Sequence, residues 1–148
     1  TSRQRFRDTF DRVDENFRAL YPRLMGGGSA KLVLSNEEDL LETGVDIFVE
    51  PPGKRLQNLS LLSGGEKAMT AIAMILSLFQ VKPSPFAVLD EDEANGARFN
   101  ALLVEMSSIA QFIVITHNRK TMDVADTLYG ITMPTPGISQ LVSVRLGA

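Results

Sequence analysis

Apolar residues near the start of the chain recur at intervals of three and four positions, which keeps them on a single stripe of an α-helix. The same spacing is typical of the seam of a coiled coil. We expect Tyr21 and Pro22 to interrupt this helix and the glycines at 26–28 to end it. Either the stripe packs on the core of this chain, or its upstream end is the root of a coiled coil. Its members are Phe6, Phe10, Val13, Phe17, Leu20 and Leu24.

Shorter apolar segments predict strands on both sides of the middle of the chain. The first two lie on either side of an acidic stretch at 36–42, and Pro51, Pro52 and Gly53 follow them as a strong turn signal. Two further strands are expected near the end of the chain. The four predicted strands are 30–34, 45–49, 128–133 and 141–146.

The middle of the chain predicts helix, strand, helix and strand in succession. Ser63 and Glu66 form the Ser-x-x-Glu pattern of a capping box, and the apolar run after them predicts a helix buried on nearly all sides. Apolar strands joined through a helix are typical of parallel sheets covered on both faces. We therefore expect an α/β fold with a mainly parallel sheet flanked by helices. Its predicted elements are a helix at 68–79, a strand at 86–89, a helix at 94–107 and a strand at 112–115.

The composition fits one ordinary globular domain. Of 148 residues, 44% are hydrophobic and 22% are charged, which excludes disorder and a collagen-like chain. No apolar run reaches the roughly 18 residues of a membrane span, and no signal-peptide pattern opens the chain. The absence of Cys excludes a disulfide framework, a thiol nucleophile and Cys-ligated zinc. Because the sequence begins at Thr1 inside a predicted helix and without Met, we expect it to be part of a longer protein.

Charge is unevenly distributed along the chain. Residues 1–31 hold seven basic and four acidic side chains, a balance of +3, whereas the rest of the chain carries −6. The basic end is either a solvated helix face or a surface that meets a polyanion such as DNA. The arginines that would make that contact are Arg3, Arg5, Arg7 and Arg12.

Polar residues directly follow each of the two central apolar strands. The first strand runs into Asp90 and Glu91, and the second into Thr116 and His117. Ligands bind outside the carboxyl ends of parallel strands, so these side chains are expected at one binding edge. The carboxylates could instead cap a helix, and a lone His is often an ordinary surface residue. Their coincidence at adjacent strand ends favours a functional site.

An apolar strand followed by Asp-Glu has the form of the Walker B element of nucleotide hydrolases. The first carboxylate of such an element holds Mg²⁺, usually through water, and the second deprotonates the attacking water. A neutral imidazole at the next strand end can hydrogen-bond the γ-phosphate. Asp90, Glu91 and His117 fit these three roles.

The most specific motif is Leu-Ser-Gly-Gly-Glu at 62–66. Glycines in the first turn of a helix expose backbone N–H groups at its positive end, beside the Ser63 hydroxyl, and this arrangement favours an anion. Glycine suits the position because a side chain would keep a phosphate from the backbone. The motif gains weight from its place ahead of a Walker B strand and a strand that ends in His.

These motifs resemble the C-terminal lobe of the head of an SMC (structural maintenance of chromosomes) protein, most similar to the bacterial chromosomal type. The resemblance covers practically the whole chain. It is carried by LSGGEKAMTAIAMILSLFQVKPSPFAVLDE, QFIVITHNRKTMDVADTLYGITM, FRDTFDRVDENFRALYPRLMGGGSAKLVL, TGVDIFVEPPGKRLQNLSLLSGGE and PGISQLVSVRL. It implies half of an ABC-type, Mg²⁺-dependent ATPase whose two heads enclose two ATP molecules. Such proteins act in chromosome condensation and segregation, in the cytoplasm and on the nucleoid.

The resemblance also implies roles for individual residues. Ser63, Gly64, Gly65 and Glu66 correspond to the ABC signature that contacts ATP on the opposite head. Asp90 corresponds to the Mg²⁺ residue, Glu91 to the catalytic base and His117 to the switch histidine. Residues 1–25 correspond to the root of the coiled coil, where family heads are expected to meet DNA, and 26–148 to the ATPase lobe. The implied partners are the N-terminal lobe of the same head, a second SMC head in a homodimer, a kleisin subunit and DNA, with no membrane.

Two features depart from the family pattern. No Walker A motif is present, because Gly53 and Lys54 belong to a PPGK turn and lack the Gly-x-x-x-x-Gly-Lys-Ser/Thr frame. The fragment alone is therefore expected to be inactive. The loop after the Walker B strand reads DEDEAN where the family has a segment resembling DEVDAALDEAN. Either this loop is truly shorter, which would impair communication between the two ATP sites, or the sequence is discontinuous there.

Two other functions remain open. A related ABC-type DNA-repair ATPase of the RecN kind carries similar motifs. The PPGK turn and TMxxADxLYG favour an SMC protein over such a repair ATPase. A transporter subunit is disfavoured, because such chains carry Walker A ahead of the signature. In isolation the fragment could instead act as a docking module for a kleisin.

Overall fold

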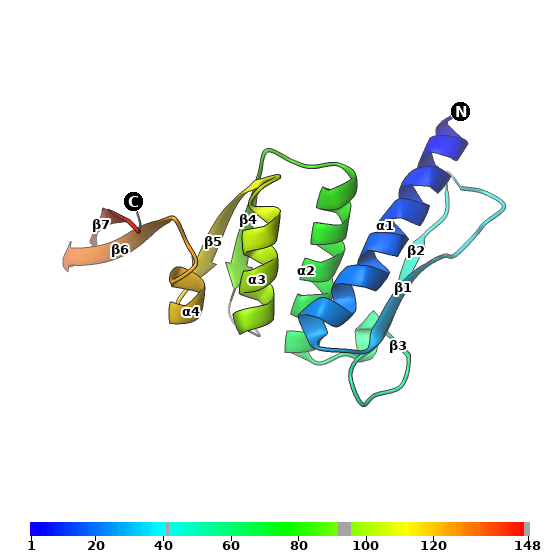
Figure 1. The fold of residues 1–148 in the computed structure, drawn as a ribbon, viewed down its shortest axis with the longest axis horizontal. Helices are drawn as coiled ribbons and strands as arrows, with labels where there is room; N and C mark the ends of the chain where they lie inside the picture. Colours follow the sequence, from blue (N-terminus) through cyan, green and yellow to red (C-terminus); the bar gives the residue numbers. More distant parts are fainter. Residues whose placement is uncertain (41, 92–95, 147–148) are drawn as a thin grey trace.

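A long helix opens the chain and lies along a small antiparallel sheet (Figure 1). The computed structural model describes residues 1–40, 42–91 and 96–146. The sheet follows the helix α1 (Ser2–Met25) and has the order β1-β2-β3. Its strands are β1 (Ser29–Leu34), β2 (Val45–Glu50) and β3 (Gln57–Asn58).

Helix α1 runs through Tyr21 and Pro22 without a break, so the predicted interruption is wrong. Pro22 lies in the last turn, where its missing N–H removes only one bond near the helix end. The Pro22 carbonyl accepts hydrogen bonds from the N–H groups of Gly26 and Gly27, each at 2.9 Å. Gly26 ends the helix in the left-handed conformation, with φ 77°.

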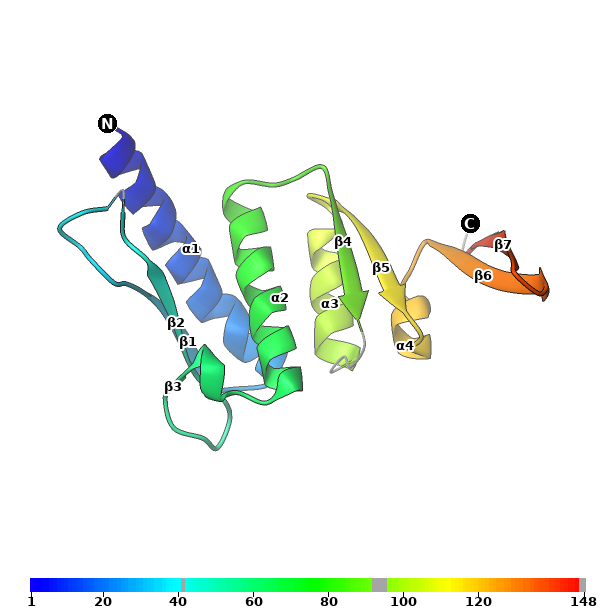
Figure 2. The ribbon, with the colours of Figure 1, turned by 180° about the vertical axis from the view of Figure 1, so that it is seen from behind.

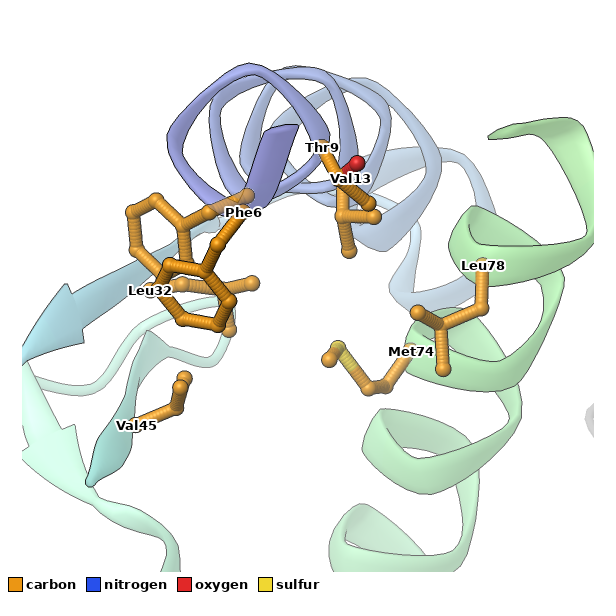
Figure 3. A pocket seen from close by; sticks show the side chains of 8 residues that line it. Phe6, Thr9, Val13, Leu32, Val45, Met74 and Leu78 are labelled. Carbon is orange, nitrogen blue, oxygen red and sulfur yellow. The ribbon is translucent and has the colours of Figure 1, made fainter. Parts of the chain in front are cut away.

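The apolar stripe of α1 packs on the core of this chain over most of its length. Its downstream members are buried against α2 and β1, whereas Phe6 and Phe10 are only half-buried. These two rings line a hollow of about 190 Å³ between α1, the first two strands and α2 (Figure 3). The assignment of residues 1–25 to the root of a coiled coil stays a prediction. The buried members are Val13, Phe17, Leu20 and Leu24.

A partly buried acidic side chain fixes α1 against the edge of the sheet. Asp14 Oδ1 accepts a hydrogen bond from the backbone N–H of Leu32 at 2.7 Å, and its Oδ2 accepts one from Arg18 Nε at 2.7 Å. Because β1 is an edge strand, this carboxylate satisfies a backbone donor that no neighbouring strand serves.

Replacing Asp14 with Ala is expected to lower the free energy of unfolding by about 1–3 kcal/mol, because the N–H of Leu32 loses its acceptor. Chemical denaturation measures the change. Asp11→Ala is the matched control, since Asp11 is exposed on the same helix and the charge change is identical. Equal stability of the two variants would contradict a structural role for Asp14.

The second helix, α2 (Gly64–Val81), follows a short 3-10 turn, η1 (Leu59–Leu61). Ser63 and Glu66 form the predicted capping box, which is confirmed. The expected burial on nearly all sides is wrong for the described residues, because the helix buries one face against α1 and leaves the other open. Ile75 is 40% exposed on the open face.

The predicted strand-helix-strand unit is confirmed. Strands β4 (Phe86–Glu91) and β5 (Gln111–Thr116) are parallel and are joined through α3 (Gly96–Met106), and α4 (Arg119–Met122) follows. The expectation that both faces of this sheet are covered is wrong for the described residues. One face packs on the helices, and the other exposes four apolar side chains, Phe86, Val88, Ile113 and Ile115.

The chain ends in an antiparallel hairpin of β6 (Thr127–Thr135) and β7 (Ile138–Arg145). It extends away from the helices in both views (Figures 1 and 2), and its side chains are largely exposed. The α/β class is confirmed, but a mainly parallel sheet is not: among the described strands only β4 and β5 pair in parallel. In the same residues no helix is long and apolar enough to cross a lipid bilayer.

Candidate functional site

The carboxyl ends of β4 and β5 bring the predicted catalytic residues to one edge. The register pairs Asp90 with Ile115 and Glu91 with Thr116, so His117 follows one position beyond the end of the pair. Asp90 and His117 are exposed. The backbone of Glu91 ends β4, while its side chain and the loop at 92–95 lie outside the described part of the chain.

His117 lies in a short connection that hydrogen bonds hold in place. The N–H of Asn118 donates to Thr116 Oγ1 at 3.0 Å, and Asn118 Oδ1 accepts from the N–H of Lys120 at 3.0 Å to cap α4. The imidazole is therefore presented between a strand end and a helix cap. This arrangement leaves it accessible to a ligand at the edge of the sheet.

Among the described side chains at this edge, Asp90 is an exposed carboxylate, which fits one contact to Mg²⁺ but not a site built by the protein alone. Among the described residues, no group of three or more acidic or histidine side chains could hold a metal ion. Mg²⁺ usually keeps several waters and binds through one or two carboxylates together with substrate phosphates. The donor set at this edge therefore fits a magnesium ion that arrives with a nucleotide.

The second group of predicted residues lies at the N-terminus of α2. The Ser63 hydroxyl donates to Glu66 Oε2 at 3.0 Å, and the Ser63 N–H donates to the same oxygen at 3.0 Å. In return, the N–H of Glu66 donates to Ser63 Oγ at 3.4 Å. Both residues are thus held rigidly at the positive end of an 18-residue helix.

Gly64 has no structural need to be glycine within this chain. Its φ is not positive, and a Cβ added there would meet no atom within 4 Å. The open space in front of the helix end is therefore accessible to a group from outside the chain, as the phosphate-binding interpretation of the motif requires.

Lys54 belongs to this group as well, although no sequence pattern indicates it. Its Nζ lies 2.8 Å from Glu66 Oε1, across twelve positions of sequence. The hydrogen bond from Lys54 and that from the Ser63 N–H hold the pKa of Glu66 below its ordinary value. In the sequence, Lys54 belongs to the PPGK turn and to an incomplete Walker A motif. No local pattern links this turn to α2, so the contact with Glu66 could not be predicted.

The two groups lie at the same end of the molecule. The N-terminus of α2 and the carboxyl ends of β4 and β5 all point toward the lower edge of Figures 1 and 2. In the described residues, no hydrogen bond or ion pair joins the two groups. They remain two separate groups at that end.

The arginines proposed for DNA contact lie on the first three turns of α1. Arg3, Arg5 and Arg12 are exposed, whereas Arg7 is half-buried, with its Nη2 3.9 Å from Glu37 Oε2. Contact with DNA stays a prediction.

Comparison with known proteins places this fold and these motifs in one family. Residues 17–140 match the family described as "RecF/RecN/SMC N terminal domain". The chain is 56% identical over 151 residues to the chromosome partition protein Smc of Myxococcus xanthus, covering 99% of this chain and 13% of that protein. The chain spans 11–13% of the length of the curated relatives reported with it.

Two solved structures share the fold. One is the Smc head domain of Pyrococcus furiosus with an extended coiled coil, bound to the C-terminal domain of ScpA. It has a TM-score of 0.90 and 38% identity, over 97% of this chain and 37% of that chain. The other comes from work on ATP-driven dimerization and DNA-stimulated activation of SMC ATPases. It has a TM-score of 0.82 and 37% identity, over 96% of this chain and 89% of that one.

Proposed function

Because this chain belongs to the RecF/RecN/SMC family, we propose that it forms the C-terminal lobe of an SMC head and supplies half of an ATPase site. The complete protein would use ATP to engage two heads during chromosome condensation and segregation, in the cytoplasm and on the nucleoid. In this proposal residues 1–25 are the root of the coiled coil and 26–148 are the ATPase lobe.

One observation carries the proposal: the parallel register of β4 and β5 sets Asp90, Glu91 and His117 at one edge. Asp90 would hold Mg²⁺, which neutralises charge on the phosphates of ATP. The Glu91 carboxylate would take a proton from the attacking water, and the His117 imidazole would donate a hydrogen bond to the γ-phosphate. Ser63, Gly64, Gly65 and Glu66 would face the ATP bound on a second head.

The exposed apolar side chains of the β4-β5 pair support the proposal that a second lobe packs on this chain. Phe86, Val88, Ile113 and Ile115 form a continuous strip on one face of the β4-β5 pair, and such a strip is normally covered. We propose that the N-terminal lobe of the same head covers this face and brings the Walker A residues. The family description names an N-terminal domain. The signature and Walker B motifs of this chain, without a Walker A motif, favour the C-terminal lobe.

Binding of a kleisin is a second proposed role. The Smc head of Pyrococcus furiosus binds the C-terminal domain of ScpA, and another solved Smc head binds the C-terminal winged-helix domain of ScpA. By analogy, this lobe would dock the corresponding domain of its own kleisin without nucleotide. The DNA-repair alternative has less support, because the reported relatives are chromosome partition proteins.

The purified chain alone is expected not to hydrolyse ATP, and mixing it with a lobe that carries Walker A is expected to restore Mg²⁺-dependent turnover. Each partner holds only part of the groups that grip the phosphates. Phosphate release with and without the second lobe measures this. Turnover by the chain alone that is abolished by Glu91→Gln would contradict the proposed division of the site.

A further inference from the structure

We propose that Lys54 is a positioning residue for the signature end of α2: it holds Glu66 in the capping box and offsets its charge, so that the N–H groups of the helix end can receive ATP from the opposite head. This role rests on the proposed function of the chain. It assigns a task to the PPGK turn, whose lysine would otherwise be an ordinary surface charge.

The contacts around Glu66 leave neither carboxylate oxygen free. Oε1 binds the Lys54 ammonium at 2.8 Å, and Oε2 accepts from both the hydroxyl and the N–H of Ser63 at 3.0 Å each. Lys54 therefore fixes the one oxygen that the capping box does not use. With both oxygens held, the carboxylate stays on Ser63 and does not rotate into the space in front of the helix end, where it would repel a phosphate.

The backbone presents Lys54 at a fixed position. Pro51 is fully buried at the end of β2, and the N–H of Lys54 donates to the Pro51 carbonyl at 2.9 Å, which closes a tight turn. Gly53 takes the left-handed conformation that this turn needs, with φ 77°. The lysine thus extends from the sheet β1-β2-β3 to the N-terminus of α2.

The contact between Lys54 and Glu66 also offsets the negative charge of Glu66. Glu66 places a negative charge in the first turn of α2, beside the N–H groups that would face a phosphate. A carboxylate there repels a polyphosphate unless a cation offsets it. Among the described residues, Lys54 is the cation in contact with this carboxylate, and its own side chain is half exposed.

The contact is expected to matter for nucleotide engagement rather than for folding. A half-exposed ion pair contributes little to stability, because water screens it. A variant that loses Lys54 should therefore melt at nearly the same temperature as the parent and still respond differently to ATP.

The test uses heads that contain both lobes, and measures the ATP concentration that gives half-maximal pairing of two heads. Lys54→Ala is expected to raise this concentration roughly fivefold, the upper range for a partly exposed charge pair. Lys54→Arg should restore most of the loss, because it keeps the charge and the hydrogen bond. Arg55→Ala is the matched control: it removes the same charge from the neighbouring exposed residue, and should pair like the parent.

A double variant separates positioning from direct contact. If Lys54 acts through Glu66, then Lys54→Ala should have no further effect in a Glu66→Gln background. An equal loss in both backgrounds would overturn the proposal, because Lys54 would then act on the nucleotide or the opposite head by itself.

Ser63→Arg in the same assay tells the two proposals apart. If Ser63→Arg blocks pairing while Lys54→Ala pairs like the parent, the role of Lys54 is wrong and the proposed function stands. If Ser63→Arg pairs normally with ATP, the proposed signature site itself is wrong.

Discussion

Replacing Glu91 with Gln in a head that contains both lobes is expected to lower ATP turnover by about 10²–10⁴-fold, the usual contribution of a general base. Glutamine has the same shape but cannot accept the proton of the attacking water. Asp90 is unchanged, so nucleotide binding should persist and paired heads should accumulate in the ATP-bound state. Phosphate release and sedimentation with ATP measure the two effects.

Two further variants test whether the effect is specific to Glu91. Glu42→Gln makes the same chemical change at an exposed residue of the loop between β1 and β2, and should leave turnover unchanged. Asp90→Asn should reduce both pairing and turnover, because it weakens the contact to Mg²⁺. Unchanged hydrolysis in Glu91→Gln would reject Glu91 as the base.

Replacing Ser63 with Arg is expected to abolish ATP-dependent pairing of heads. Ser63 is exposed, and the space in front of Gly64 is open, so the arginine would occupy the position proposed for the opposing nucleotide. Its bulk keeps phosphate oxygens from the N–H groups of α2. Sedimentation with and without ATP measures the loss.

The variant also removes the N-cap of α2, and a second variant isolates that cost. Ser63→Ala loses the cap without adding bulk, at about 1 kcal/mol of stability, and should retain part of the pairing. Ser108→Arg adds the same side chain at an exposed serine elsewhere and should pair normally. Normal pairing by Ser63→Arg would argue against the site at this helix end.

The elements whose signals are local could be predicted from the sequence. The capping box at Ser63 and Glu66 and the parallel pair of β4 and β5 form where the pattern placed them. Hydrophobic periodicity and capping act within a few residues, so a short window contains the information. The predicted interruption at Pro22 is wrong because it depends on tertiary packing. Near the end of α1, packing of Tyr21 and Leu24 in the core outweighs one lost hydrogen bond.

Burial could not be predicted from the pattern, because it depends on what covers each face. Ile75 on α2 and the strip on β4-β5 resemble core residues, yet this chain leaves them exposed. The apolar residues on these open faces are consistent with our proposal that the second lobe of the head covers them. A mainly parallel sheet was expected for the same reason, since runs of apolar residues do not reveal which strands pair.

The sequence by itself determined the chemistry that the chain can bring: a serine and glycines at a helix end, two carboxylates after one strand and a histidine after the next. These depend on residue type and spacing alone. Only the tertiary structure decided which of them meet. The β4-β5 register sets Asp90 and Glu91 beside the segment that leads to His117, and the turn at Pro51 brings Lys54 to Glu66. Contacts between distant positions depend on how the elements pack, and local sequence patterns do not encode that packing.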